Sequence, residues 1–137
     1  MERIETYIKL ISAIAATITA QFLGGFDMWL RILVTFIILD FVTGVLKAIY
    51  TKKLSSDVSH KGGIRKVGIL VIVAVAVCLD ILLNTDFLRT FTIGFYICHE
   101  GISILENLSE LDLPIPEKIK DVLIQLENKA NEGDKDV

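Results

Sequence analysis

The segment KAIYTKKLSSDVSHKGGIRK, residues 47–66, decides how the rest of the chain is arranged. On both sides of it the sequence becomes apolar for long enough to cross a bilayer, which takes about 20 residues. Lysine and arginine in a short loop between two membrane spans stay on the cytoplasmic side, because they resist translocation and are attracted to anionic headgroups. We therefore predict a cytoplasmic loop here. Its cations, which we assign to topology and lipid contact, are Lys47, Lys52, Lys53, Lys61, Arg65 and Lys66.

The composition of the 137 residues is typical of an integral membrane protein. Hydrophobic residues make up 53% of the chain, and the net charge of −3 conceals a basic centre and an acidic C-terminal end. The basic cluster is a short segment between spans, so we expect no nucleic-acid partner. Cys78 and Cys98 fall inside apolar runs, where thiols behave as small hydrophobes. Their spacing indicates neither a disulfide framework nor a metal site, and we expect no cofactor.

Counting outward from the basic segment predicts an all-α protein with four transmembrane helices. The expected spans are residues 8–26, 28–49, a third from about residue 67 to the outer turn at 84–86, and 87–105. Four crossings would place both termini in the cytoplasm. The first span is rich in Ala, Thr and Ser rather than Leu, and it is the weakest of the four. If it lies flat on the membrane, three crossings remain and the N-terminus lies outside.

The sequence divides into a transmembrane domain, residues 1–112, an amphipathic cytoplasmic helix, residues 113–130, and a charged flexible tail, residues 131–137. Pro116 opens the amphipathic helix, since proline fits the first helical turn. The helix is too short and too charged to span a bilayer, so we expect it on the inner membrane surface or paired with another copy. Its apolar face is formed by Ile119, Val122, Leu123 and Leu126.

Small residues recur every fourth position in two of the expected spans, and at that spacing two helices in lipid can approach closely. We assign these residues to helix packing, with pore lining as the alternative for the first span. They are Ser12, Ala16 and Ala20 in the first span and Gly44 and Ala48 in the second.

Polar side chains inside the spans are the chemically informative residues. Tyr96, Glu100, Ser103 and Asn107 follow one helical face as a stripe, and Asp40 shares a face with Thr43. Unsatisfied polar groups in hydrocarbon cost several kcal/mol, so this stripe must face another helix or water. Asp80 lies near the outer end of the third span. The intramembrane polar and gating candidates are Asp40, Thr43, Asp80, Glu100, Ser103 and Asn107.

Asp40 and Glu100 are expected at one depth, since each lies about 18 Å from the outer start of its span. Two ionised carboxylates at one depth in a low-dielectric bundle would repel, so at least one should be protonated or hydrated. For the basic segment a second role stays open beside topology and lipid contact. In this second role, Arg65 or Lys66 also pairs with an acid of the C-terminal helix, such as Glu117 or Asp121.

Three blocks of sequence resemble the phage-lysis and toxin-secretion holin family of Gram-positive bacteria and their phages, in particular its clostridial toxin-secretion members. They are Asp40 to Ala48; Gly62 to Val67 with Asp80 to Leu82; and Glu100 to Asn107, followed by Leu113-Pro114-Ile115-Pro116 and an amphipathic helix. The resemblance covers roughly residues 30–128 and leaves out the first span.

The resemblance implies that the chain accumulates in the cytoplasmic membrane, forms homo-oligomers and opens lesions that release a cell-wall hydrolase or a large toxin. Two alternatives remain from the residues alone. One is a small ion channel or transporter that uses the intramembrane carboxylates, and the other is an assembly protein that conducts nothing. We expect no enzyme activity, because the sequence holds no evident nucleophile–base constellation.

Overall fold

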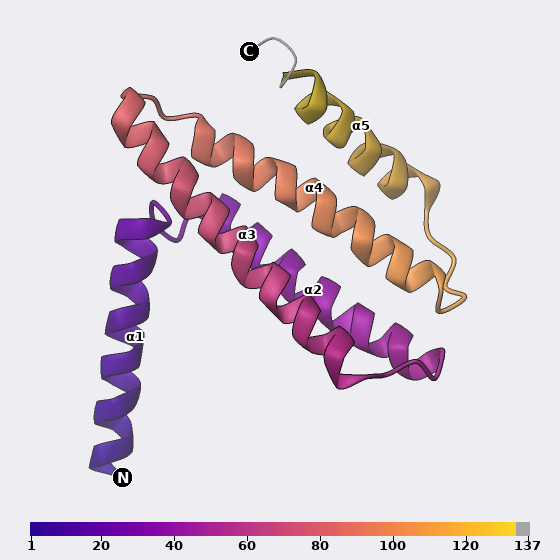
Figure 1. Ribbon diagram of the computed structural model, residues 1–137, viewed down its shortest axis with the longest axis horizontal. Helices are drawn as coiled ribbons and strands as arrows, with labels where there is room; N and C mark the ends of the chain where they lie inside the picture. Colours follow the sequence, from indigo (N-terminus) through magenta and orange to yellow (C-terminus); the bar gives the residue numbers. More distant parts are fainter. Residues whose placement is uncertain (134–137) are drawn as a thin grey trace.

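The computed structural model describes residues 1–133, apart from the side chains of residues 58, 59 and 133 (Figure 1). Within this part the chain is all-α, which confirms the predicted class. The helices are α1 (Glu2–Phe22), α2 (Met28–Tyr50), α3 (Ser56–Leu83), α4 (Leu88–Ser109) and α5 (Glu117–Gly133). Helices α2, α3 and α4 form a three-helix bundle in which α2 and α4 run in one direction and α3 runs in the other (Figure 1).

The bundle has a small apolar core and an apolar outside. The core consists of Leu30, Leu33, Ile69, Val73 and Ile93. Many large apolar side chains of α2 and α3 point outward, which a water-soluble domain of this size would not tolerate over so wide an area. Residues Met28–Tyr50 and His60–Leu83 are long and apolar enough to cross a membrane, and only 17% and 22% of an apolar 18-residue stretch within each is buried in the bundle. These two helices indicate a membrane protein; the count of four crossings stays a prediction.

Helix α3 begins at Ser56, so the predicted basic loop is wrong in its second half. Only residues 51–55 connect α2 to α3, and Lys61, Arg65 and Lys66 are helical. Helix α3 has 28 residues. At 1.5 Å per residue it extends about 42 Å, more than the hydrocarbon thickness of about 30 Å. The charged residues show where the apolar run starts, at about residue 67, but the helix itself begins before that point, at Ser56. Asp57 in its first turn favours a helix start there.

Arg89 fixes the opposite end of the bundle by binding the connection between α1 and α2. Its Nε donates to the carbonyl oxygen of Leu23 at 2.5 Å, and its Nη2 donates to that of Gly25 at 2.9 Å. Its Nη1 lies 2.8 Å from Asp27 Oδ2, and this hydrogen-bonded pair holds the pKa of Asp27 below its usual value. Gly24 has φ +73°, and a methyl group there would lie 2.6 Å from Arg89 Nε. Glycine is therefore required where the guanidinium crosses the chain.

Helix α1 leaves the bundle at this end and is not parallel to it (Figure 1). None of its residues is buried in the described part of the chain. Ser12, Ala16 and Ala20 are accordingly exposed. Their assignment to helix packing stays a prediction that requires a second copy of the chain.

Helix α5 turns back and packs along α4 (Figure 1), where the sequence indicated the membrane surface or another copy. The contact is close because Gly101 has no side chain: a methyl group there would lie 3.0 Å from Leu123 Cδ2 and 3.2 Å from Phe36 Cε2. The rest of the expected apolar face, Ile119, Val122 and Leu126, remains exposed. Helix α5 also includes residues 131–133 of the predicted tail, whereas residues 134–137 lie outside the described part.

The two ends of the bundle predict an accessibility experiment. In a Cys78→Ala/Cys98→Ala background, a cysteine from Lys53→Cys in the 51–55 connection should be protected from an impermeant thiol reagent in intact cells. A cysteine from Asp86→Cys, in the turn between α3 and α4, should be labelled, because the positive charge is held inside. Permeabilised cells, in which both positions must react, provide the control. Strong labelling at position 53 in intact cells would reverse the orientation.

Candidate functional site: a buried polar cluster

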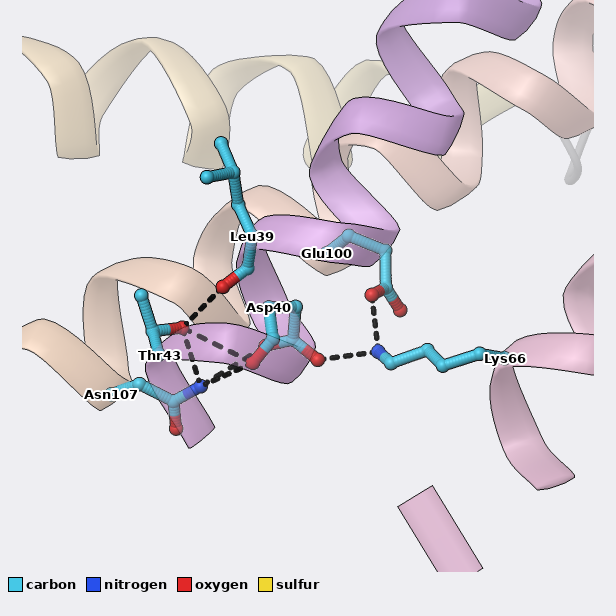
Figure 2. Close-up of polar contacts among 6 residues, drawn as sticks. All are labelled: Leu39, Asp40, Thr43, Lys66, Glu100 and Asn107. Atoms are coloured by element: carbon cyan, nitrogen blue, oxygen red, sulfur yellow. Dashed lines mark hydrogen bonds and ion pairs between the residues drawn. The ribbon is translucent and has the colours of Figure 1, made fainter. Parts of the chain in front are cut away.

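Five side chains from three helices meet inside the bundle and are here called the polar cluster: Asp40 and Thr43 of α2, Lys66 of α3, and Glu100 and Asn107 of α4 (Figure 2). Glu100 is 2% exposed, and Asp40, Thr43 and Asn107 are also buried. The helical repeat places Thr43 one turn after Asp40, and Asn107 two turns after Glu100, so each pair lies on one face. The stripe predicted on α4 therefore faces α2 and α3.

Lys66 lies between the two acids. Its ammonium group donates hydrogen bonds to Asp40 Oδ2 and to Glu100 Oε2, so that one cation bridges α2 and α4 (Figure 2). The four-carbon stem of lysine allows this reach from the helix that runs the other way. A buried carboxylate is tolerated only when it is paired and hydrogen-bonded, and here two carboxylates depend on the same partner.

Asn107 completes the cluster on the other side of Asp40. Its Nδ2 donates to Asp40 Oδ1 and to Thr43 Oγ1, both at 3.1 Å. The Thr43 hydroxyl in turn donates to the carbonyl oxygen of Leu39 at 2.8 Å. Within the described part of the chain, every buried side-chain nitrogen and oxygen has a hydrogen-bond partner. The cluster is thus closed, and it needs no water while the three helices stay together.

The sequence correctly placed Asp40 and Glu100 at one level, but it missed the residue that joins them. Lys66 was assigned to lipid contact or to an acid of the C-terminal helix, and in the structure it pairs with Asp40 and Glu100 instead of Glu117 or Asp121. The signal was present: Asp40 and Glu100 lie deep in their spans, whereas the cations of those spans, Arg31, Lys47 and Arg89, lie near the span ends. A lysine on the first apolar turns of the neighbouring helix is the nearest source of positive charge.

Asp80 lies at the opposite end of the bundle, away from the polar cluster. Its Oδ1 accepts from Thr85 Oγ1 at 2.6 Å and from the Leu88 backbone N–H at 3.1 Å, and its Oδ2 accepts from the Arg89 N–H at 2.8 Å. Free N–H groups at a helix start favour such a carboxylate. In this arrangement Asp80 caps α4, and the structure does not bring it to the other gating candidates.

The remaining predicted residues gather at the basic end of the bundle, where α2 ends and α3 begins. Lys47 Nζ lies 2.9 Å from Glu110 Oε1, and Tyr50 donates to Asp112 Oδ2 at 2.9 Å, which fastens α2 to the end of α4. Gly44 lies against Asn107, since a methyl group there would be 3.6 Å from Asn107 Nδ2. Ser103 and Ala48 line a cavity at this end, and Lys52 is exposed in the connection.

One family model and three relatives show what this chain is similar to. The model of the bacteriophage holin family matches residues 17–128, so the match includes the end of α1 that the sequence blocks left out. A 14.9 kDa protein of Clostridium perfringens is 46% identical over 131 residues, which cover 94% of this chain and 99% of that protein. YqxH of Bacillus subtilis is 38% identical over 113 residues, 82% of this chain and 81% of YqxH.

A protein of Bacillus phage phi105 that carries the name probable holin is 36% identical over 112 residues. The shared part covers 81% of this chain and 83% of the phage protein. No solved structure matches the chain.

The bridging position of Lys66 predicts a large loss of stability in Lys66→Met, because two buried acids then lack their cation. We expect a loss of about 3–5 kcal/mol in the free energy of unfolding, measured in detergent micelles with the fluorescence of Trp29. The triple variant Lys66→Met/Asp40→Asn/Glu100→Gln should recover much of it. Lys47→Met, whose partner Glu110 is half-exposed, is the matched control and should lose less than about 1 kcal/mol. Equal losses for Lys66→Met and Lys47→Met would contradict the buried bridge.

Proposed function

The chain belongs to the bacteriophage holin family, and we propose that it oligomerises in the cytoplasmic membrane and forms lesions that release a cell-wall hydrolase or a large toxin. The observation that carries the proposal is the polar cluster, whose buried polar atoms are all hydrogen-bonded inside a bundle with an apolar outside. Polar side chains inside a membrane must face one another or water. If the three helices separated at this cluster, its buried polar groups would form a surface that water can line.

Oligomerisation follows from the size of the released protein. One chain of 137 residues cannot enclose an opening wide enough for a folded enzyme, so many copies must surround it. Two features support contacts between copies. Helix α1 is exposed along its length, with small residues every fourth position, and the outward faces of α2 and α3 are apolar. Small residues let helices approach closely in lipid, where packing rather than hydrophobicity drives association.

The alternative of a selective channel or transporter is less favoured by the position of Lys66. A carboxylate that binds a passing cation must be free to coordinate it. Asp40 and Glu100 instead share the Lys66 ammonium, so a passing cation would have to displace this lysine first. The cluster is therefore better suited to connecting helices than to binding ions along a conduction pathway.

Opening would relieve a charge imbalance in this arrangement. With two carboxylates and one ammonium ionised, the cluster has one excess negative charge while the three helices are together. A net charge is costly in a low-dielectric interior and is stabilised by water. We propose that the hydrogen bonds of the cluster hold the closed form, while its excess charge favours the hydrated form. The timing of lysis then depends on the balance between the two.

Expression in a bacterial host that also makes a cytoplasmic cell-wall hydrolase tests the proposed function. The chain should first accumulate without effect, then stop growth abruptly, collapse the membrane potential and release the hydrolase into the medium. A potential-sensitive dye and hydrolase activity in the supernatant measure these steps. Cells that carry abundant membrane-inserted protein and keep both potential and hydrolase would refute the proposal. Selective cation flux without protein release would support the channel instead.

Glu100→Gln tests the charge balance, because glutamine keeps hydrogen bonding and removes the excess charge. We expect this variant to insert and oligomerise normally but to trigger later than the wild-type chain, with the onset of lysis as the measurement. Lys66→Gln increases the imbalance and should trigger earlier. Glu106→Gln makes the same charge change at an exposed position of α4 and is the matched control. Wild-type timing in both Glu100→Gln and Lys66→Gln would leave the cluster a purely structural role.

A further inference from the structure

A basic cavity opens at the end of the bundle where α2 ends and α3 begins. Its volume is about 720 Å³, and its walls come from the last turns of α2, the connection 51–55, the first turns of α3 and the last turns of α4. Its lining includes two acids, Asp40 and Glu110. The lining also includes five cations: Lys47, Lys53, Lys61, Arg65 and Lys66.

Three of these cations face the cavity without a carboxylate. Lys47 is paired with Glu110, and Lys66 is paired with Asp40 and Glu100. In the described part of the chain, no carboxylate lies within ion-pair distance of Lys53, Lys61 or Arg65. Like charges that line one hollow repel each other, so an anion between them would stabilise this end of the bundle. The hydroxyl of Ser103 adds a neutral hydrogen-bonding group to the lining.

An apolar groove adjoins the basic cavity. The groove has a volume of about 570 Å³ and is lined by Phe41, Gly63, Ile64 and Val67, with His60 as its polar member. Phe41 lines both hollows, so they meet at this ring. The groove exists because α3 has glycine at this level: a methyl group at Gly63 would meet no atom within 4 Å. Ile64 and Val67 are 71% and 63% exposed, which leaves an apolar surface ready to be covered.

We propose that the two hollows together bind one anionic glycerophospholipid, with its phosphate in the basic cavity and an acyl chain along the groove. A ligand that carries a negative group next to a long apolar chain matches both linings, and a membrane supplies it at high local concentration. Basic pockets between membrane helices recognise anionic headgroups in the same way. A free phosphate would use the cavity and leave the groove empty. This lipid site is an addition to the proposed lytic function. Lipid binding there does not depend on whether lesions open.

Native mass spectrometry of the full chain in detergent tests this site, because it counts bound lipid directly. Dioleoyl phosphatidylglycerol should form a one-to-one adduct that phosphatidylcholine with the same chains does not form. Lys61→Gln/Arg65→Gln should weaken phosphatidylglycerol binding by about fivefold for each charge removed. Lys118→Gln/Lys120→Gln on α5, which removes two charges away from the cavity, is the matched control and should bind like the wild-type chain. Equal binding of the two lipids, or equal loss in the two double variants, overturns the proposal.

Gly63→Leu tests the groove separately and keeps every cation. The space at Gly63 accepts a side chain, and leucine favours a helix more than glycine does, so the variant should fold. It should lose most of the phosphatidylglycerol adduct by occupying the place of the acyl chain. Gly68→Leu, also in open space but outside the groove, is the control and should keep the adduct. Full binding by Gly63→Leu, together with displacement of lipid by millimolar inorganic phosphate, would identify a free-phosphate site and refute the lipid site.

Discussion

The ammonium group of Lys66, between the carboxylates of Asp40 and Glu100, is the interaction on which the rest of the bundle depends. It joins all three helices at one point, whereas the apolar core lies closer to the opposite end. In lipid, the apolar contacts between helices add little, because the surrounding chains are equally apolar. A charged contact that cannot be satisfied by lipid therefore contributes disproportionately to holding the helices together.

The sequence predicted the helical class, the bounds of α2 and the polar face of α4, since these follow from apolar length and helical period. It did not predict the partner of Asp40 and Glu100. Lysine near an apolar run is equally compatible with a headgroup and with a buried acid, and only the position of α3 against α2 and α4 decides between them. The packing partner of α5 was not predicted for a related reason: its apolar face indicates burial, but the small size of Gly101 determines where the helix packs.

The two ends of the bundle differ in how they are held. At one end Asp80 caps α4 by accepting from backbone N–H groups. The Arg89 side chain binds backbone carbonyl oxygens of the connection between α1 and α2. At the other end the contacts are the ion pair of Lys47 with Glu110 and the hydrogen bond of Tyr50 to Asp112, both between partly exposed side chains. Long side chains at a wet surface rearrange at little cost. The helices are consequently held less firmly at the basic end, beside the polar cluster, than at the other end.

The contacts of Arg89 also bear on how this protein can diverge. Two of its hydrogen bonds end on the carbonyl oxygens of residues 23 and 25, which any amino acid provides. These hydrogen bonds place no demand on the side chain of residue 23, but Leu23 also packs against the apolar core, which favours an apolar residue there. Position 24 is more restricted, because its φ of +73° favours glycine and a methyl group there would lie 2.6 Å from Arg89 Nε. The sequence of α1 can therefore change among related chains while Gly24 and Arg89 preserve its attachment to the bundle.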